Sequence, residues 1–245
     1  MTRVTGDSGL QSEVLEDLVE ARNYRRWLVD LIGPHLGDDP LEVGGGLGHY
    51  AADWVAVRAA QGLTRFTTSE ADPSRLAALR ERFAADPTVT VRELAVPIEE
   101  VAAYSSVVAC NVLEHIPDDV AALRAFAGLV RDEGAVVVVV PAFPSAMSRF
   151  DRAIGHERRY RRASLRRAAE AAGLTVEVLH HVNLPGLLAW LVTVKLLRTR
   201  PRAGLLLTVY DRGVVPWLRR LEGRRPPPFG QSLLLVARVP QRDAR

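Results

Sequence analysis

Apolar and polar positions along this chain follow two periods, one typical of strands and one of helices. Short apolar runs rich in β-branched residues predict strands near 40–44, 65–70, 89–94, 105–110, 134–140, 175–182 and 231–238. Between the first five runs, apolar residues at helical spacing predict helices near 48–61, 74–86 and 118–131, with a less regular stretch at 95–103. A further one or two amphipathic helices are predicted within 13–36. This alternation is typical of βαβ units and a parallel sheet.

The pattern predicts an α/β fold, a Rossmann-like, seven-stranded, mostly parallel sheet with helices on both faces. The continuous run from Ala135 to Val140 is typical of a strand that is covered on both sides. Before it, Asp132 to Gly134 predicts a turn that leaves the preceding helix. We expect N-terminal helices at 1–38, a core at 39–182 and 231–240, and a helical insert at 183–230 between the last two strands.

A glycine-rich turn connects the first strand to the helix that follows it. Residues 42–48 read E-V-G-G-G-L-G, with glycines at 44, 46 and 48. Glycine tolerates positive φ and has no Cβ, so a ligand can approach the main chain closely. Free N–H groups at the start of the next helix would face that ligand. The turn therefore predicts a site for a nucleotide-type cofactor.

The spacing of the glycines separates two kinds of cofactor. A dinucleotide-binding fingerprint needs G-x-G-x-x-G, and His49 stands where its last glycine would be. The observed G-x-G-x-G after an acidic residue resembles the first motif of the class I S-adenosylmethionine-dependent methyltransferases. A second stretch, N-V-L-E-H-I-P-D-D at 111–119, is similar to one found in many small-molecule members of that class.

The resemblance implies a cofactor, S-adenosyl-L-methionine, and the residues that hold it. Glu42 would help to hold the methionine amino group of the cofactor. Glu70, at the end of the second strand, would accept hydrogen bonds from both ribose hydroxyls. Leu94 lies in the region that borders the adenine, and Asn111 would contact the methionine end. The full expected cofactor set is Glu42, Gly44, Gly45, Gly46, Gly48, Glu70, Ala71, Leu94, Asn111 and Val112.

The segment D-R-A-I-G-H-E-R-R-Y at 151–160 resembles a pattern of one bacterial methyltransferase group, and similarity to that group extends over residues 40–240. His156, His115 and Tyr160 are the candidate catalytic residues. Histidine titrates near neutral pH, as a base for a hydroxyl acceptor requires. Two structural alternatives stay open: His115 could tie its loop to nearby backbone, and His156 could belong to a structural cluster with Glu157, Arg159 and Tyr160.

The predicted insert contains an apolar stretch, 184–197, followed by Arg198, Arg200 and Arg202. It is too short to span a bilayer, which takes about 20 residues. It could pack over the sheet or on a second copy of the chain, or cover an apolar substrate as a lid. It could also lie on a membrane surface through 183–202, with cationic flanks.

Composition narrows the location and the partners. The net charge of +3 is the sum of −10 over residues 1–144 and +13 over 145–245. Such a basic half suits an anionic substrate or membrane face. No aromatic-rich basic strand or recognition helix points to nucleic acid. A polar N-terminus and a single cysteine, Cys110, predict a reduced, cytoplasmic setting, with membrane-peripheral contact as an extension.

These observations predict a methyltransferase for a small or lipid-like acceptor, such as a secondary-metabolite or lipid-linked intermediate. A nicotinamide-dependent oxidoreductase is disfavoured by His49. A protein that keeps the cofactor without transferring a methyl group, and docks a partner through its insert, remains an alternative. No His, Asp or Glu cluster has the sequence spacing of metal ligands, so no metal is expected.

Overall fold

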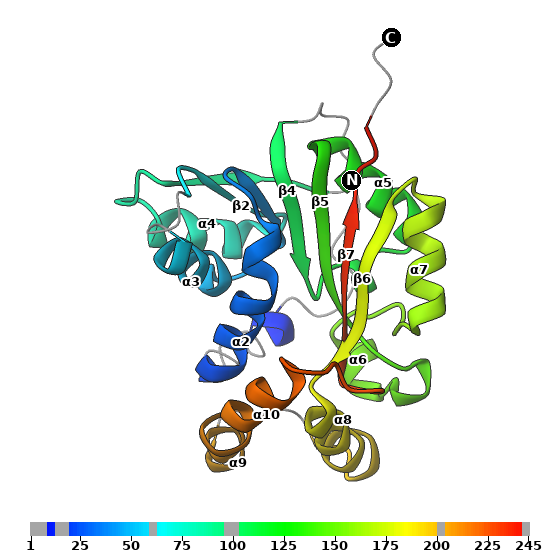
Figure 1. Cartoon of the computed structure of the whole chain (residues 1–245). Coiled ribbons are helices and arrows are strands. Elements are labelled where there is room, and N and C mark those ends of the chain that lie inside the picture. The colour runs from blue at the N-terminus through cyan, green and yellow to red at the C-terminus, as the bar shows by residue number, and fades with distance from the viewer. Residues whose placement is uncertain (1–8, 13–19, 59–62, 96–102, 200–203, 242–245) are drawn as a thin grey trace.

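The computed structural model describes residues 9–12, 20–58, 63–95, 103–199 and 204–241, and its centre is a seven-stranded sheet (Figure 1). The strand order is β3-β2-β1-β4-β5-β7-β6. The strands are β1 (Pro40–Val43), β2 (Phe66–Glu70), β3 (Val89–Glu93), β4 (Tyr104–Cys110), β5 (Val130–Pro141), β6 (Thr175–Val182) and β7 (Ser232–Arg238). Neighbours from β3 to β5 pair in parallel, and β7 is antiparallel to both β5 and β6. The predicted fold class is confirmed.

Helices cover both faces of the sheet (Figure 1). Those of the core are α2 (Arg22–Ile32), α3 (His49–Arg58), α4 (Pro73–Arg82), α5 (Asp119–Leu129), α6 (Arg149–Ala153) and α7 (Arg162–Ala171). The predicted segments 13–19, 59–61 and 96–102, and the flanking Arg200 and Arg202, lie outside the described residues. Asp72 caps α4 by accepting the N–H groups of Ser74 and Arg75.

Side chains that alternate along β5 pack into two apolar cores, one on each face of the sheet. Val136, Val138 and Val140 join the apolar cluster under α5 and α7. Val137 and Val139 join the cluster under α2, α3 and α4. Successive side chains of a strand point to opposite faces, so a continuous run of valines packs against helices on both sides.

The predicted turn at 132–134 is wrong, because β5 already begins at Val130. The strand is irregular there: Tyr104 pairs with Val130, and the next register pair joins Ser106 to Ala135. Glu133 adopts a positive φ of 61° inside this irregularity. The turn-forming residues thus make a bulge in a strand rather than a separate turn.

Two helical arms connect β6 to β7, each of them a run of consecutive helical elements. They are α8 (Leu184–Trp190) with the π-helical η5 (Leu191–Leu196), and α9 (Leu205–Val209) with the π-helical η6 (Tyr210–Val214) and α10 (Val215–Glu222). Asp211 fastens the second arm to α2 by accepting the backbone N–H groups of Asn23 and Tyr24 at 3.0 and 2.9 Å. None of the helices in the described part of the chain has the length and apolar character needed to cross a bilayer. The division of the chain into three regions stays a prediction.

Candidate functional site

The glycine turn lies at the carboxyl end of β1. Gly44, Gly46 and Gly48 have φ values of 71°, 57° and 76°, a region that residues with a side chain enter only at a cost. The positive φ values confirm that the backbone of this turn favours glycine at positions 44, 46 and 48.

The space beside most of these glycines is filled by the chain itself. A Cβ at Gly44 would lie 2.5 Å from Val112 Cγ2, and one at Gly45 would lie 2.2 Å from Thr68 Oγ1. A Cβ at Gly48 would lie 2.7 Å from the Phe83 ring. At these three positions glycine is required by neighbouring side chains, a requirement that the sequence interpretation had attributed to a ligand.

Glu70 connects the end of β2 to the glycine turn. Its Oε2 accepts the N–H of Gly46 at 3.0 Å, while Oε1 accepts those of Ala71 and Asp72 at 2.9 and 3.0 Å. The buried guanidinium of Arg75 lies 3.3 Å from Oε1. Because a carboxylate offers about four acceptor positions, Oε2 retains capacity for a hydroxyl donor at the edge of the sheet.

The other expected cofactor residues gather at the same edge. Asn111 follows β4, is exposed, and adopts a positive φ of 55° while its N–H bonds to Val139 O at 2.8 Å. Val112 packs against Gly44, as described above. Leu94 is buried, and its N–H lies 3.3 Å from the carbonyl of Glu70. The carboxyl ends of β1, β2 and β4 thus form one candidate crevice, which is where ligands bind in such sheets.

Glu42 is buried within the sheet and accepts a hydrogen bond from the Thr68 hydroxyl at 2.7 Å. Burial raises the pKa of this carboxyl to about 7. The Glu42 carboxyl lies next to Gly45, beneath the glycine turn. Its raised pKa places it close to its protonation midpoint at neutral pH.

Two of the three candidate catalytic residues come together. The rings of His115 and His156 meet edge to face, with their centroids 4.7 Å apart. Beside them lies Glu114, a fully buried carboxyl whose two oxygens have no hydrogen-bond partner within the described structure. Burial raises the pKa of Glu114 to about 7 and lowers that of His115 to about 4, so His115 is neutral at pH 7.

An acidic residue and an arginine orient His156. Asp151 Oδ1 lies 3.0 Å from His156 Nδ1 and also accepts two bonds from the Arg159 guanidinium, at 3.0 and 2.8 Å. Although desolvation opposes it, hydrogen bonding to His156 and Arg159 lowers the pKa of Asp151 well below its usual range. This carboxylate stays ionised and fixes the imidazole ring.

Tyr160 lies apart from the histidines. It is buried, and its hydroxyl donates to Asp119 Oδ2 at 3.0 Å. Desolvation together with the charge of Asp119 raises its pKa well above the usual range. Its backbone forms a parallel bridge with Ala142. The arrangement gives Tyr160 a role in holding the loop after β5, and its catalytic role stays a prediction.

Sequence reasoning missed Glu114, Asp151 and Arg75 as members of the site. Asp151 and His156 are five residues apart in the quoted 151–160 stretch, and a hydrogen-bonded pair at that spacing was readable there. The Arg75–Glu70 pair has the same five-residue separation, whereas Glu114 gave no such signal because His156 is distant in the sequence. The metal-ligand argument from spacing also missed the Glu114, His115 and His156 group, whose ligand atoms lie within 4.8 Å of one another.

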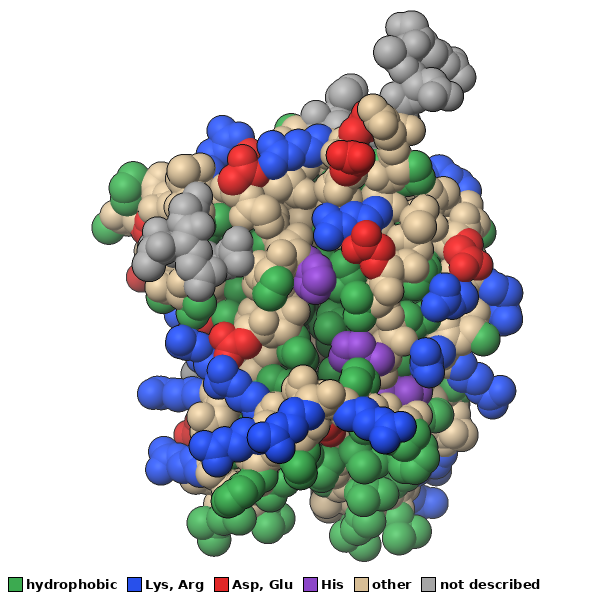
Figure 2. Space-filling model, viewed as in Figure 1, with side chains coloured by type: hydrophobic (Ala, Val, Ile, Leu, Met, Phe, Trp, Pro, Cys, Tyr) green, Lys and Arg blue, Asp and Glu red, His purple; other side chains and the backbone are tan. Residues whose placement is uncertain are grey.

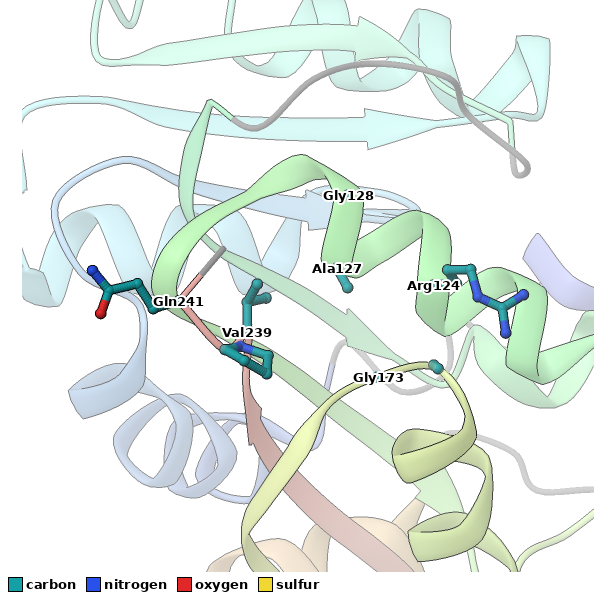
Figure 3. A pocket seen from close by; sticks show the side chains of 8 residues that line it. Arg124, Ala127, Gly128, Gly173, Val239 and Gln241 are labelled. Atoms are coloured by element: carbon teal, nitrogen blue, oxygen red, sulfur yellow. The ribbon is translucent and has the colours of Figure 1, made fainter. Parts of the chain in front are cut away.

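A separate hollow lies at the opposite end of the sheet (Figure 3). It is formed by the end of α5, the turn before β6 and the residues after β7, and Arg124 is its only charged lining residue. These segments lie at the amino ends of the parallel strands. The hollow therefore has no part in the candidate crevice.

Comparison with known proteins relates part of the chain to a family. Residues 41–136 match the family described as methyltransferase domain. The matched segment contains the glycine turn, Glu70, Asn111 and Glu114. No curated protein matches the sequence.

Solved structures extend the likeness to almost the whole chain. A chain from the complex of the Haloferax volcanii Trm112 methyltransferase activator with a methyltransferase is 15% identical, with 94% of each chain covered and a TM-score of 0.61. Haemonchus contortus phosphoethanolamine N-methyltransferase 2, bound to S-adenosyl-L-methionine, is 16% identical over 84% of this chain and 49% of its own, with a TM-score of 0.56.

The same fold also hosts other chemistry. The 4+2 cyclase SpnF is 18% identical, covers 88% of this chain and 80% of its own, and has a TM-score of 0.56. At these identities the likeness defines the fold, and function must be argued from the site. S-adenosyl-L-methionine, expected from the sequence, agrees with the matched family and with the ligand of the Haemonchus neighbour.

Proposed function

We propose that this protein transfers the methyl group of S-adenosyl-L-methionine to a small or lipid-like acceptor. The observation that carries the proposal is the meeting of the glycine turn, Glu70 and Asn111 at one sheet edge, within the segment that matches the methyltransferase domain family. Glu70 would hold the ribose hydroxyls, the backbone at Asn111 and Val112 the methionine end, and Glu42 would act from beneath the turn. S-adenosyl-L-homocysteine is the product.

The bound sulfonium supplies the reactivity, so the protein's tasks are to align the acceptor and to exclude water. A hydroxyl acceptor must also lose its proton. The cluster of Glu114 and His115, which follow β4, with His156, which follows α6, is where we place acceptor activation. Asp151 and Arg159 act by positioning His156.

The experiment is a two-stage measurement. Calorimetric titration with S-adenosyl-L-methionine tests the crevice, with NADH as the competing cofactor. Transfer of a radiolabelled methyl group is then followed separately into the lipid and the aqueous metabolite fractions of a cell extract. We expect binding of the sulfonium compound alone and label in the lipid fraction. Binding without any transfer would favour the non-methylating scaffold, and binding of NADH would overturn the proposal.

We further propose that the protein works at an anionic membrane surface through its helical arms. Every large apolar side chain that is strongly exposed in the described structure belongs to this region: Leu188, Leu191, Val192, Leu196, Leu197, Leu205, Leu206, Val209, Val214, Trp217, Leu221 and Phe229. Leu205 and Leu206 are 78% and 82% exposed. An apolar surface of this extent marks an interaction site.

The charged residues around this apolar surface indicate what binds to it. Within the described part of 184–230, the exposed charged residues are all basic: Lys195, Arg198, Arg212, Arg219, Arg220, Arg224 and Arg225. Figure 2 shows arginine and lysine side chains in a band directly above the apolar end of the molecule. An apolar tip below a cationic rim fits the acyl and headgroup layers of an anionic bilayer, where each basic residue contributes about 1 kcal/mol.

Vesicle sedimentation tests the membrane contact. We expect binding to vesicles that contain phosphatidylglycerol and much weaker binding to phosphatidylcholine alone. Leu206→Asp and Arg225→Glu should each weaken binding several-fold, whereas Arg80→Glu, an equally exposed position on α4, should not. A dimer that Leu206→Asp dissociates, without vesicle binding, would assign the surface to a second copy of the chain and overturn this contact.

A further inference from the structure

Glu114 is a buried acid without a donor. It lies in the short helical turn η3 (Leu113–His115) after β4, and its side chain has no exposed surface. Neither carboxylate oxygen has a hydrogen-bond partner among the described residues. A carboxyl group in this position loses its hydration and gains nothing in exchange, so some positive charge or proton has to compensate it.

The His156 ring faces this carboxyl. Asp151 can only accept a hydrogen bond from His156 Nδ1, 3.0 Å away, so when the ring carries a single proton that proton lies on Nδ1. The other ring nitrogen, Nε2, then carries a lone pair, and it lies 3.8 Å from Glu114 Oε1. Two electron-donating atoms therefore face each other in a buried space.

The His115 ring has the same arrangement as that of His156, with Nδ1 next to an acceptor and Nε2 as the basic nitrogen. Its Nδ1 lies 3.2 Å from the carbonyl oxygen of Gly155, which also only accepts, so Nδ1 carries the proton and Nε2 is the basic nitrogen. A ring held by a hydrogen bond from one nitrogen to a carbonyl or carboxylate is the usual arrangement of a metal-binding histidine. Both histidines here have it, through Gly155 and Asp151.

We propose that Glu114, His115 and His156 bind a divalent transition-metal ion, with Zn²⁺ as the best match. One carboxylate and two imidazoles are a ligand set of catalytic zinc sites, which leave a fourth position for water or substrate. The ligand atoms of the three residues lie within 4.8 Å of one another, close enough to share one ion after small side-chain adjustments. Asp151 and the Gly155 carbonyl supply the outer contacts that orient both rings.

The ion would give the site a chemical task, and this part rests on the proposed methyl transfer. A hydroxyl acceptor that enters the open position would coordinate through oxygen, which lowers the pKa of the hydroxyl. Its proton passes to solvent, and the oxygen then takes the methyl group from the sulfonium. In this form of the protein His156 acts as a ligand and not as a base.

Cobalt titration tests the site directly, because Co²⁺ replaces Zn²⁺ and absorbs visible light when bound in a tetrahedral N/O site. We expect one equivalent to bind the purified, metal-stripped protein, and Zn²⁺ to displace it. Glu114→Gln, which preserves shape, and His156→Ala should each weaken binding at least about 10-fold, as should Asp151→Asn through the orientation of His156. His180→Ala, a histidine on β6 outside the cluster, is the matched control and should bind normally.

Two results would overturn the proposal. One is the absence of stoichiometric Co²⁺ and Zn²⁺ binding by protein that is folded in thermal melting. The other is equal affinity in Glu114→Gln, which would show that the Glu114 carboxylate is not a ligand of the ion. Metal binding is measured without substrate, so a failure of methyl transfer alongside intact metal binding would refute the proposed function alone.

Discussion

The guanidinium of Arg159 lies 4.4 Å from the centre of the Trp190 ring, and the same guanidinium holds Asp151 by two hydrogen bonds. Trp190 belongs to α8, and Asp151 orients His156. A continuous line of contacts thus joins the first helical arm to the histidine cluster. Contact of that arm with a membrane or an acceptor would reach the cluster through these residues.

Arg159→Lys tests the strength of this line. Lysine keeps the charge but loses the planar fork and the ring contact. Because the Asp151 partner is fully buried, we expect the free energy of unfolding in urea to fall by about 2–4 kcal/mol. Arg166→Lys alters an exposed pair with Glu170 and should change it by less than about 0.5 kcal/mol. Equal effects of the two substitutions would contradict a stabilising role of the buried contacts that Arg159 makes with Asp151 and Trp190.

Gly46→Ala should abolish binding of S-adenosyl-L-methionine in calorimetry. Its positive φ of 57° disfavours any side chain, and its N–H faces Glu70. Gly173→Ala is the control, since it has a positive φ of 85°, open space around it, and a place far from the crevice. Both variants should lose similar stability, and only Gly46→Ala should lose the cofactor. Loss of binding in both would assign the effect to general destabilisation.

Glu70→Gln should weaken cofactor binding by about 1.5–3 kcal/mol, or roughly 10- to 150-fold, because charge-assisted hydrogen bonds to the ribose become neutral ones. The amide has a single oxygen, so it cannot accept from Gly46 and from both Ala71 and Asp72, and a thermal melt checks separately that the turn keeps its shape. Glu81→Gln, an exposed acid on α4, is the matched control. An unchanged dissociation constant for Glu70→Gln would place the ribose elsewhere.

Stability should depend on pH through Glu42. Its pKa is raised from 4.5 to about 7 in the folded chain, so between these values the folded state binds more protons than the unfolded state. Stability therefore falls as pH rises through this interval, by about 3 kcal/mol in total for this group. Glu42→Gln keeps the Thr68 contact and should show a smaller decline between pH 5 and 8 in urea unfolding. Parallel curves for the two proteins would contradict the raised pKa.

The sequence predicted the strands of this fold to within one or two residues, except for β5. Apolar runs bounded by turn signals locate buried strands well, because burial on both faces leaves no polar alternation to confuse them. The start of β5 was missed because Asp132 to Gly134 has turn chemistry, and only pairing with β4 shows that the chain stays in the sheet as a bulge.

The candidate site was predictable only in part. The glycine turn and Glu70 could be located because parallel strands bring their carboxyl ends to one edge. The contact of Glu114 with His156 joins segments that are distant in the sequence, and no local pattern specifies it. The space beside Gly44 was misread for the same reason, since Val112 reaches it from another strand's end.

The arms leave and rejoin the sheet at neighbouring points, since Val182 and Ser232 are register partners on β6 and β7. A segment attached at two adjacent positions can differ in length without separating the strands that carry it. The helical arms between β6 and β7 could therefore differ among relatives while the crevice proposed for the methyl donor stays the same. One catalytic body could in this way serve acceptors that reside in quite different surroundings.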